Sequence, residues 1–247
     1  MSFQLYSDIH TELKKGKFPE IHPKARNLIL AGDIGKITME NFKNFIRYCS
    51  ERWEHIFFVF GNHEFYASHS IKSLKNQYRK YFEEFPNIHL LDSEYFILDG
   101  IAIYGFIAWT RPLFNTASLA KSHGLNDYYK ITTIKGSLKP KDIEQMVNEE
   151  LSKFKDFILK VNNSEIECNS VLIVTHFPPL GNGTSNPIYN NNYLNRYFSW
   201  LDLLNTENIS CNKIKVWCSG HTHWSYDFIK SGIRFLSNQI GYSDEEL

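Results

Sequence analysis

The chain has 247 residues, and its 27 lysines and arginines are balanced by 27 aspartates and glutamates. Hydrophobic residues make up 43% of the chain and charged residues 22%, which is ordinary for a globular protein. A neutral chain has no net field that would attract nucleic acid or an acidic membrane, and no apolar run approaches the roughly 18 residues that a membrane span needs. We therefore expect one globular domain, residues 1–247, without a membrane segment and with no strong sign of nucleic acid binding.

The cysteine pattern favours a reducing compartment. The four cysteines, Cys49, Cys168, Cys211 and Cys218, show no C-x-x-C spacing. The first ten residues, MSFQLYSDIH, lack the basic and then apolar pattern of a secretory leader. These features predict a cytoplasmic protein, and the sequence leaves its oligomeric state open.

Short apolar runs, each followed by glycine or polar residues, predict five buried strands. They are Phe3–Tyr6, Leu28–Ala31, Ile56–Phe60, Val171–Thr175 and Ile214–Cys218. Apolar residues three and four positions apart predict helices between them, at Met39–Arg52, Ile71–Phe82 and Ile143–Val161. This alternation of strand and helix predicts a layered α/β fold.

Two hairpins are predicted as well, one turning at Asp99-Gly100 and the other at Ser231-Gly232. Hairpins join antiparallel strands, so we expect mixed sheets. The polar stretch Gly181–Asn195 predicts a long surface loop that overhangs a binding site, although its composition does not identify a ligand.

Every predicted strand is followed by side chains that can bind a metal ion. The segments are SDIH with Asp8 and His10, AGDIG with Asp33, GNHE with Asn62, His63 and Glu64, THFPP with His176, and GHTH with His221 and His223. Ligands of α/β proteins bind at the carboxyl ends of the strands, so these loops are expected to converge. A single aspartate or histidine at such a place is more often a turn or capping residue, but five in succession favour a site.

The donor types indicate which ions would bind. Carboxylates, imidazoles and one amide suit manganese, iron or zinc better than calcium. Seven side chains are too many for one ion with open positions, and they suit two ions that share a carboxylate. The seven are Asp8, His10, Asp33, Asn62, His176, His221 and His223. Gly32, Gly61 and Gly220 lie beside them, where the backbone must turn sharply or approach another group closely.

The order Asp-x-His, Gly-Asp, Gly-Asn-His-Glu, His and Gly-His-x-His, from Asp8 to His223, resembles that of the calcineurin-like binuclear metallophosphoesterases. The resemblance implies a four-layer α/β/β/α sandwich of two mixed β-sheets flanked by helices. It also implies hydrolysis of a phosphomonoester or phosphodiester by a hydroxide that bridges two metal ions. It divides the seven ligands into Asp8, His10 and His223 for one ion, Asn62, His176 and His221 for the other, and Asp33 as the bridge.

The same resemblance leaves His63 beside the ions as a second catalytic group. His63 would stabilise the phosphoryl oxygens or protonate the leaving group, and Asp8 is the expected hydrogen-bond partner of its ring. Many family members read Gly-Asp-x-x-Asp/Asn, whereas Lys36 stands at the last of these positions here. Stretches similar to an uncharacterised branch of the family make Asn126, Asp127 and Asn238 further candidates, and turn or capping roles are the alternative for each.

A small phosphorylated substrate is the expected partner, and a nucleotide is one candidate. Several aromatic residues near the motifs could stack on a base, although core packing is the commoner role. They are Phe65, Tyr66, Trp109, Tyr128, Tyr129, Phe177 and Trp224. Two alternatives stay open: a noncatalytic binding scaffold of the same fold, and a two-metal hydrolase of an amide or ester.

Overall fold

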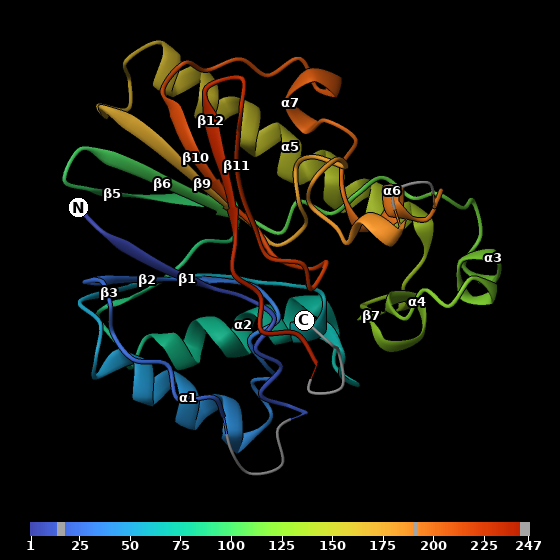
Figure 1. The fold of residues 1–247 in the computed structure, drawn as a ribbon. Coiled ribbons are helices and arrows are strands. Elements are labelled where there is room, and N and C mark those ends of the chain that lie inside the picture. Colours follow the sequence, from blue (N-terminus) through green and yellow to red (C-terminus); the bar gives the residue numbers. More distant parts are fainter. Residues whose placement is uncertain (14–17, 190–191, 243–247) are drawn as a thin grey trace.

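The computed structural model describes residues 1–13, 18–189 and 192–242. Two β-sheets lie face to face, one with four strands and one with six. Helices α1 (Glu40–Ser50) and α2 (Ile71–Phe82) cover the outer face of the smaller sheet, and α5 (Pro140–Asn162) covers that of the larger sheet (Figure 1). The expected α/β/β/α sandwich is thereby confirmed.

The four-stranded sheet is parallel throughout. Its strands follow one another in the order β1 (Phe3–Tyr6), β2 (Asn27–Ala31), β3 (His55–Val59) and β4 (Ile88–Leu90). All neighbouring pairs are parallel, and α1 and α2 supply the crossovers from β2 to β3 and from β3 to β4. The expectation of two mixed sheets is therefore corrected for this one, because both predicted hairpins belong to the other sheet.

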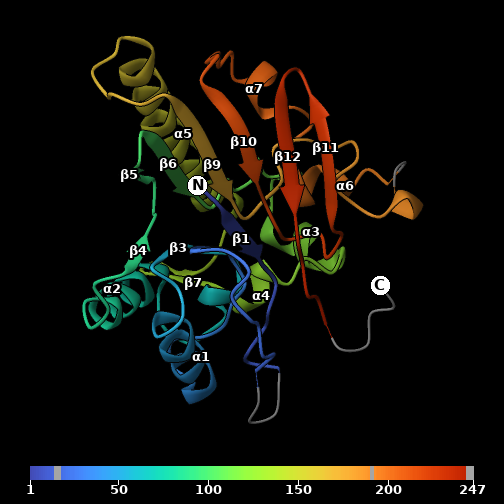
Figure 2. The same cartoon turned by 60° about the vertical axis from the view of Figure 1, so that its left-hand side comes forward.

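The six-stranded sheet is mixed, with the strand order β11-β12-β10-β9-β6-β5. Its strands are β5 (Glu94–Leu98), β6 (Ile101–Phe106), β9 (Ser170–Thr175), β10 (Ile214–Cys218), β11 (Tyr226–Lys230) and β12 (Ile233–Ser237). The central pairs are parallel, and only the two edge hairpins are antiparallel. Figure 2 shows this sheet with α5 on its outer side.

Strand residues alternate between two layers of the core. In β3, Ile56 and Phe58 belong to the layer that includes the helices, whereas Phe57 and Val59 pack between the sheets. β2, β6 and β9 repeat this alternation. Because both faces are buried, the strands read as continuous apolar runs, which is why the sequence revealed them.

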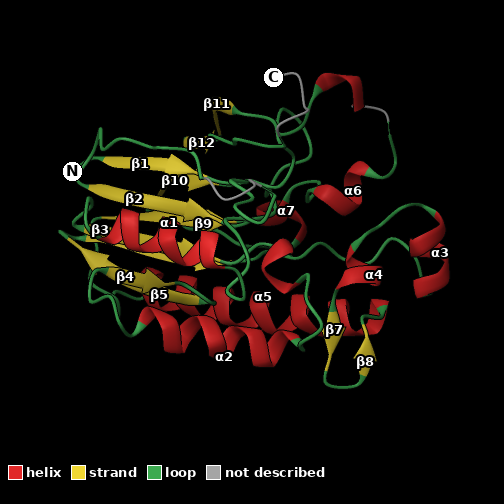
Figure 3. Ribbon diagram, turned by 90° about the horizontal axis from the view of Figure 1, so that it is seen from below, coloured by secondary structure: helices red, strands yellow, loops and turns green. Residues whose placement is uncertain are grey.

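Shorter elements gather on one side of the sandwich, beyond the carboxyl ends of the strands (Figures 1 and 3). They are α3 (Ala117–Ser122), α4 (Asp127–Lys130), β7 (Thr132–Thr133), β8 (Gly136–Ser137) and α6 (Asn195–Phe198). Single 3-10 turns lie at His63–Phe65 and Pro187–Tyr189, and α7 (Leu203–Thr206) precedes β10. The predicted loop Gly181–Asn195 includes the second of these turns and ends at the start of α6, although residues 190–191 lie outside the described part. None of the described helices is long and apolar enough to cross a membrane.

Candidate metal centre and active site

The loops after the strands are tight turns that direct the predicted ligands inward. Five of the predicted metal ligands have left-handed backbone, with φ of 54° at Asp8, 49° at His10, 53° at Asp33, 75° at His221 and 52° at His223. Such a conformation costs an L-residue roughly 1–2 kcal/mol and persists where the surroundings enforce it. Hydrogen bonds between loops do so here: the His10 amide donates to the Asp33 carbonyl at 3.0 Å, and the Gly220 amide donates to the His176 carbonyl at 2.9 Å.

Gly61 allows two of these loops to approach each other. A Cβ atom at this position would lie 2.2 Å from Asp33 Oδ1 and 2.8 Å from His176 Nε2. Both distances are far inside van der Waals contact. A larger residue would therefore push the carboxylate and the imidazole apart, which gives a physical reason for glycine in the GNHE motif.

A first cluster joins the β1 loop to the β10 loop. His10 Nε2 lies 3.2 Å from His223 Nε2, and His223 Nε2 lies 3.5 Å from Asp8 Oδ1. Asp8 and His10 are fully buried. The ligand-capable atoms of Asp8, His10 and His223 all lie within 4.8 Å of one another.

A second cluster surrounds His176 at the end of β9. Its Nε2 lies 3.0 Å from Asn62 Oδ1, 3.1 Å from His221 Nδ1 and 3.4 Å from Asp33 Oδ1. The other carboxylate oxygen of Asp33 lies 3.8 Å from His10 Nε2 in the first cluster. The structure thus brings all seven predicted metal-ligand residues together, with Asp33 between the two clusters.

The donor atoms of these clusters fit cations. His176 Nδ1 donates to the Ala31 carbonyl at 3.0 Å, so in the neutral ring Nε2 carries the lone pair. That lone pair faces the Asn62 and Asp33 oxygens, which are acceptors too. These acceptors need a positive charge among them: burial lowers the pKa of His176, but the Asp33 carboxylate outweighs burial and raises that pKa to about 9, so without metal ions a proton takes this place. Divalent ions bound by imidazole, carboxylate and amide oxygen would satisfy them.

Asp127 sets the orientation of Asn62. Its carboxylate is buried, and its Oδ1 accepts hydrogen bonds from Asn62 Nδ2 at 2.8 Å and from the Tyr66 hydroxyl at 2.6 Å. The Tyr197 hydroxyl donates to the other oxygen. Because the amide nitrogen of Asn62 is held by Asp127, its Oδ1 faces His176. Asp127 was only a second-rank candidate in the sequence, since nothing there revealed that α4 contacts this loop.

Glu64 links the loops that carry Asp33 and Asn62. This fully buried carboxylate accepts backbone hydrogen bonds from Asp33 and Gly61 on one oxygen and from Ile34 and Gly35 on the other, at 2.6–3.1 Å. The sequence showed Glu64 as a metal-capable residue of GNHE. Its described contacts instead give it a role in shaping the loops.

His63 lies beside the first cluster, but its partner differs from the expected one. The hydrogen bond expected from the His63 ring to Asp8 is corrected, because Asp8 accepts the backbone amide of His221, at 3.1 Å to each oxygen. Glu12 takes that place: its Oε1 lies 3.2 Å from His63 Nδ1. Asp8 is turned toward the β10 loop, whereas Glu12 lies on the far side of His10. The D-x-H-x-E spacing was a signal that the sequence analysis did not use.

Charge around His63 favours its protonated form. Burial lowers the pKa of the imidazole, but the carboxylates of Asp33 and Glu12 outweigh burial and raise that pKa above its usual value. Burial likewise raises the pKa of Glu12, but hydrogen bonds from His10 and His63 outweigh it and lower the pKa to about 2. In the protein without metal ions, both shifts favour an ion pair between the two groups.

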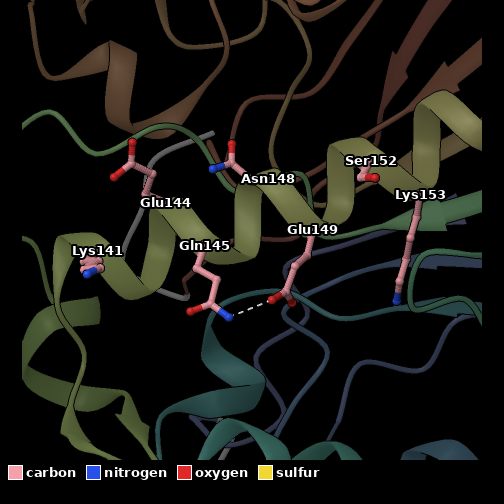
Figure 4. A pocket seen from close by; sticks show the side chains of 7 residues that line it. All are labelled: Lys141, Glu144, Gln145, Asn148, Glu149, Ser152 and Lys153. Atoms are coloured by element: carbon pink, nitrogen blue, oxygen red, sulfur yellow. Dashed lines mark hydrogen bonds between the residues drawn. The ribbon is translucent and has the colours of Figure 1, made fainter.

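A cavity of about 410 Å³ opens beside the clusters. Its lining includes Asp33, Asn62 and His63 together with aromatic side chains such as Tyr189 and Phe198. A shallower hollow of about 640 Å³ runs along the polar face of α5, far along the chain from the ligand loops (Figure 4). All of its lining residues come from that one helix, and none is a predicted ligand. The smaller cavity is therefore the candidate substrate site.

The other candidates divide between core and surface. Phe65, Trp109, Tyr128 and Phe177 are buried in the core, as the commoner role of aromatics predicted. Tyr66 instead lines the cavity and stacks on His63, with the ring centroids 4.1 Å apart. Further lining residues are Asn126, Tyr197 and Tyr242. Asn238 is structural, since its side chain donates to the Leu5 carbonyl at 2.7 Å.

Solved structures share this fold at low sequence identity. Phosphopantetheinyl hydrolase from Mycobacterium tuberculosis has a TM-score of 0.67 and 14% identity, over 97% of this chain and 89% of that one. A dimetal phosphatase from Danio rerio has a TM-score of 0.54 and 13% identity, over 95% and 86% of the two chains. A putative 5'-nucleotidase from Staphylococcus aureus has a TM-score of 0.55 and 12% identity, over 95% of this chain and 48% of that one.

The sequence comparisons identify the family. An uncharacterized protein of Acanthamoeba polyphaga mimivirus is 34% identical over 228 residues, which cover 88% of this chain and 79% of that protein. The family model for calcineurin-like phosphoesterases matches residues 2–225. From this match over most of its length, the chain belongs to the calcineurin-like phosphoesterase family.

Proposed function

We propose that this protein is a two-metal phosphoesterase that hydrolyses a phosphomonoester or phosphodiester of a small, nucleotide-type substrate. One observation supports it above all: the seven predicted ligands converge in two clusters, with one Asp33 oxygen near each. Asp8, His10 and His223 would hold one ion, and Asn62, His176 and His221 the other. Asp33 would contact both, and manganese, iron or zinc suits this donor set.

Divalent ions at this centre would activate water and withdraw negative charge from the phosphoryl oxygens. The residues of the chain supply the rest. Asp8 stays charged within the first cluster: burial raises its pKa, but the neighbouring histidines outweigh burial and lower that pKa. Glu64 holds the loop that carries Asn62, and Asp127 orients the Asn62 side-chain amide. The second cluster depends on both.

His63 is the proton donor in this proposal. His63 lines the cavity; its Nε2 lies 3.3 Å from the Tyr242 hydroxyl and 4.0 Å from Asp33 Oδ2, while its Nδ1 is paired with Glu12. In hydrolysis, water loses a proton to the solvent as its oxygen forms a bond to phosphorus, and the bond to the leaving oxygen breaks. The leaving oxygen takes the proton from His63 Nε2 and departs as an alcohol.

The cavity supports a small organic leaving group. Its volume of about 410 Å³ falls in the range of pockets that bind small ligands. Aromatic walls, including Tyr66, Tyr189 and Phe198, offer faces on which a nucleobase can stack. The phosphoryl group would lie against the clusters and the leaving group against these walls.

Hydrolysis of p-nitrophenyl phosphate and bis(p-nitrophenyl) phosphate, with manganese or with chelator, tests this function. We expect manganese-dependent turnover, and the preferred ester distinguishes a phosphatase from a phosphodiesterase. His63→Ala should keep its metal ions yet lose rate, most strongly with a less activated ester such as a phenyl phosphate. Loss of a metal ion in this variant would show that His63 is a ligand and not the acid. Absence of turnover despite two bound ions would favour a binding scaffold.

A further inference from the structure

A single carboxylate oxygen connects two histidine rings beside the clusters. Glu12 Oε1 lies 3.0 Å from His10 Nδ1 and 3.2 Å from His63 Nδ1. The two rings are in edge contact, with centroids 4.5 Å apart and planes at 70°. One of these rings belongs to the first metal cluster, and the other is the proposed proton donor.

A carboxylate that accepts a hydrogen bond from Nδ1 of a histidine keeps a proton on that nitrogen, and this determines the role of the opposite ring nitrogen, Nε2. With a hydrogen atom on Nδ1, neutral His10 presents a lone pair at Nε2, and protonated His63 presents an N–H at Nε2. Both Nε2 atoms are turned toward the same place, at 3.8 and 4.0 Å from Asp33 Oδ2. Glu12 thus sits behind both rings while their working nitrogens face the metal centre.

The surroundings of Glu12 argue against a purely structural carboxylate. The side chain is only 3% exposed, and among the described residues its second oxygen, Oε2, is buried without a hydrogen-bond partner. A buried carboxylate kept for stability alone would be expected to satisfy both oxygens, as Glu64 does with four backbone amides. The described hydrogen bonds to side chains that Glu12 makes go to the two histidines.

We propose that Glu12 is a positioning residue that holds the Nδ1–H of His10 and of His63 together, so that His10 offers its lone pair to a metal ion and His63 offers its proton to the leaving oxygen. This inference rests on the proposed function. Glu12 would act through the two rings and touch neither substrate nor metal ion.

Kinetics with two leaving groups test the part that concerns His63. The substrates are the p-nitrophenyl and phenyl esters of whichever class the wild type hydrolyses, at saturating manganese. Glu12→Ala should lower kcat about 100-fold with the phenyl ester, whose leaving oxygen needs a proton, and much less with the p-nitrophenyl ester. KM should change little. Glu12→Gln keeps an acceptor oxygen and should recover part of the loss.

Two further variants complete the kinetic design. The double variant Glu12→Ala, His63→Ala should lose little beyond His63→Ala alone, because the two residues act as one unit. Glu144→Ala removes an exposed glutamate from the α5 face in Figure 4 and should match the wild type in every measurement.

Imidazole NMR of the metal-free protein tests the contact itself, without turnover. Glu12→Ala should remove the protected Nδ1–H signals of His10 and His63. The Nδ1–H signal of His176 should persist as an internal control, because its acceptor is the Ala31 carbonyl.

Equal loss of rate with both esters, or persistence of both ring signals in Glu12→Ala, would overturn the inference. A wild type that is inactive toward every phosphoester would contradict the proposed function instead. The ring signals would still decide whether Glu12 positions the two histidines.

Discussion

Asp33 lies between the two clusters with one carboxylate oxygen near each, and it is 2% exposed. Its backbone is held as well: the amide donates to Glu64, and Oδ1 accepts the His63 amide at 2.8 Å. A substitution that removes the negative charge of Asp33 but keeps the shape of its side chain therefore affects both clusters.

We therefore predict that Asp33→Asn loses most of its bound metal, since a neutral amide cannot balance two cations. Its hydrolysis rate should fall by a factor of about 1000 or more. Metal analysis and turnover of the purified variant measure this. The matched control is Asp156→Asn, which changes an exposed aspartate paired with Lys160 on α5 and should resemble the wild type. Two retained ions with wild-type turnover in Asp33→Asn would contradict the assignment.

Lys36 occupies the position where many family members carry Asp or Asn. Its side chain makes no hydrogen bond or ion pair with any residue in the described part of the chain. We predict that Lys36→Ala retains most activity and binds metal as tightly as the wild type. A loss of ten-fold or more, read in steady-state kinetics, would mean that Lys36 contacts the substrate.

The seven ligand candidates could be predicted from the sequence because each follows a strand in a short, dense motif. Glu12 could not be assigned in the same way. Its role depends on the left-handed turns at Asp8 and His10, which direct Asp8 toward the β10 loop and leave His63 to Glu12. A spacing of two residues does not reveal such a turn.

At the scale of elements, the segment between β6 and α5 matters most. It forms α3, α4 and the β7–β8 hairpin, and it delivers Asp127 to Asn62. These elements have two to six residues, too few for a hydrophobic period, so the sequence analysis left the segment without structure. The longer helices and the buried apolar strands, by contrast, were predicted within a few residues: α2 and β10 have the expected ends.

Asp127→Asn tests the support that α4 gives to the second cluster. An amide at this position can no longer accept hydrogen bonds at both oxygens, so Asn62 and Tyr197 lose a charged acceptor. We expect metal affinity to fall 10- to 100-fold, which is typical when a group that orients a ligand is removed. Titration of the metal-free protein with manganese measures this, with Asp156→Asn as control. An unchanged affinity would show that Asn62 is oriented without α4.

At the scale of the molecule, the two sheets and their helices form a frame whose strand ends meet at the candidate metal centre. The layered α/β fold was predictable because buried strands are apolar on both faces. The two hairpin turns in the sequence indicated which strands pair antiparallel. Which strands share a sheet was not predictable, because pairing such as that of β10 between β9 and β12 depends on contacts distant in sequence.

One buried carboxyl group in this frame makes stability depend on pH. Glu150, in α5, accepts a hydrogen bond from the backbone amide of Trp109 at 3.2 Å, and burial raises its pKa to about 8 from the usual 4.5. Between these values the folded protein keeps a proton that the unfolded chain has lost. The stability that this proton contributes is fully present at acidic pH and is lost as the pH rises toward 8.

We predict that the free energy of unfolding of the wild type, relative to Glu150→Gln, falls with rising pH by up to about 1.4 kcal/mol per pH unit in this range. Urea denaturation of both metal-free proteins across the range measures the difference. A difference that stays constant with pH would show that Glu150 is ionised in the folded protein.

The central claim is that two ions, joined through Asp33, act on a phosphoester. Its most direct test is a titration of the metal-free protein with manganese in which bound ions per chain and hydrolysis of a p-nitrophenyl phosphoester are followed together. The account predicts two ions per chain in the wild type, hydrolysis that appears as the centre fills, and loss of both in Asp33→Asn. Full hydrolysis with one ion or none, or with both ions retained in Asp33→Asn, would contradict it.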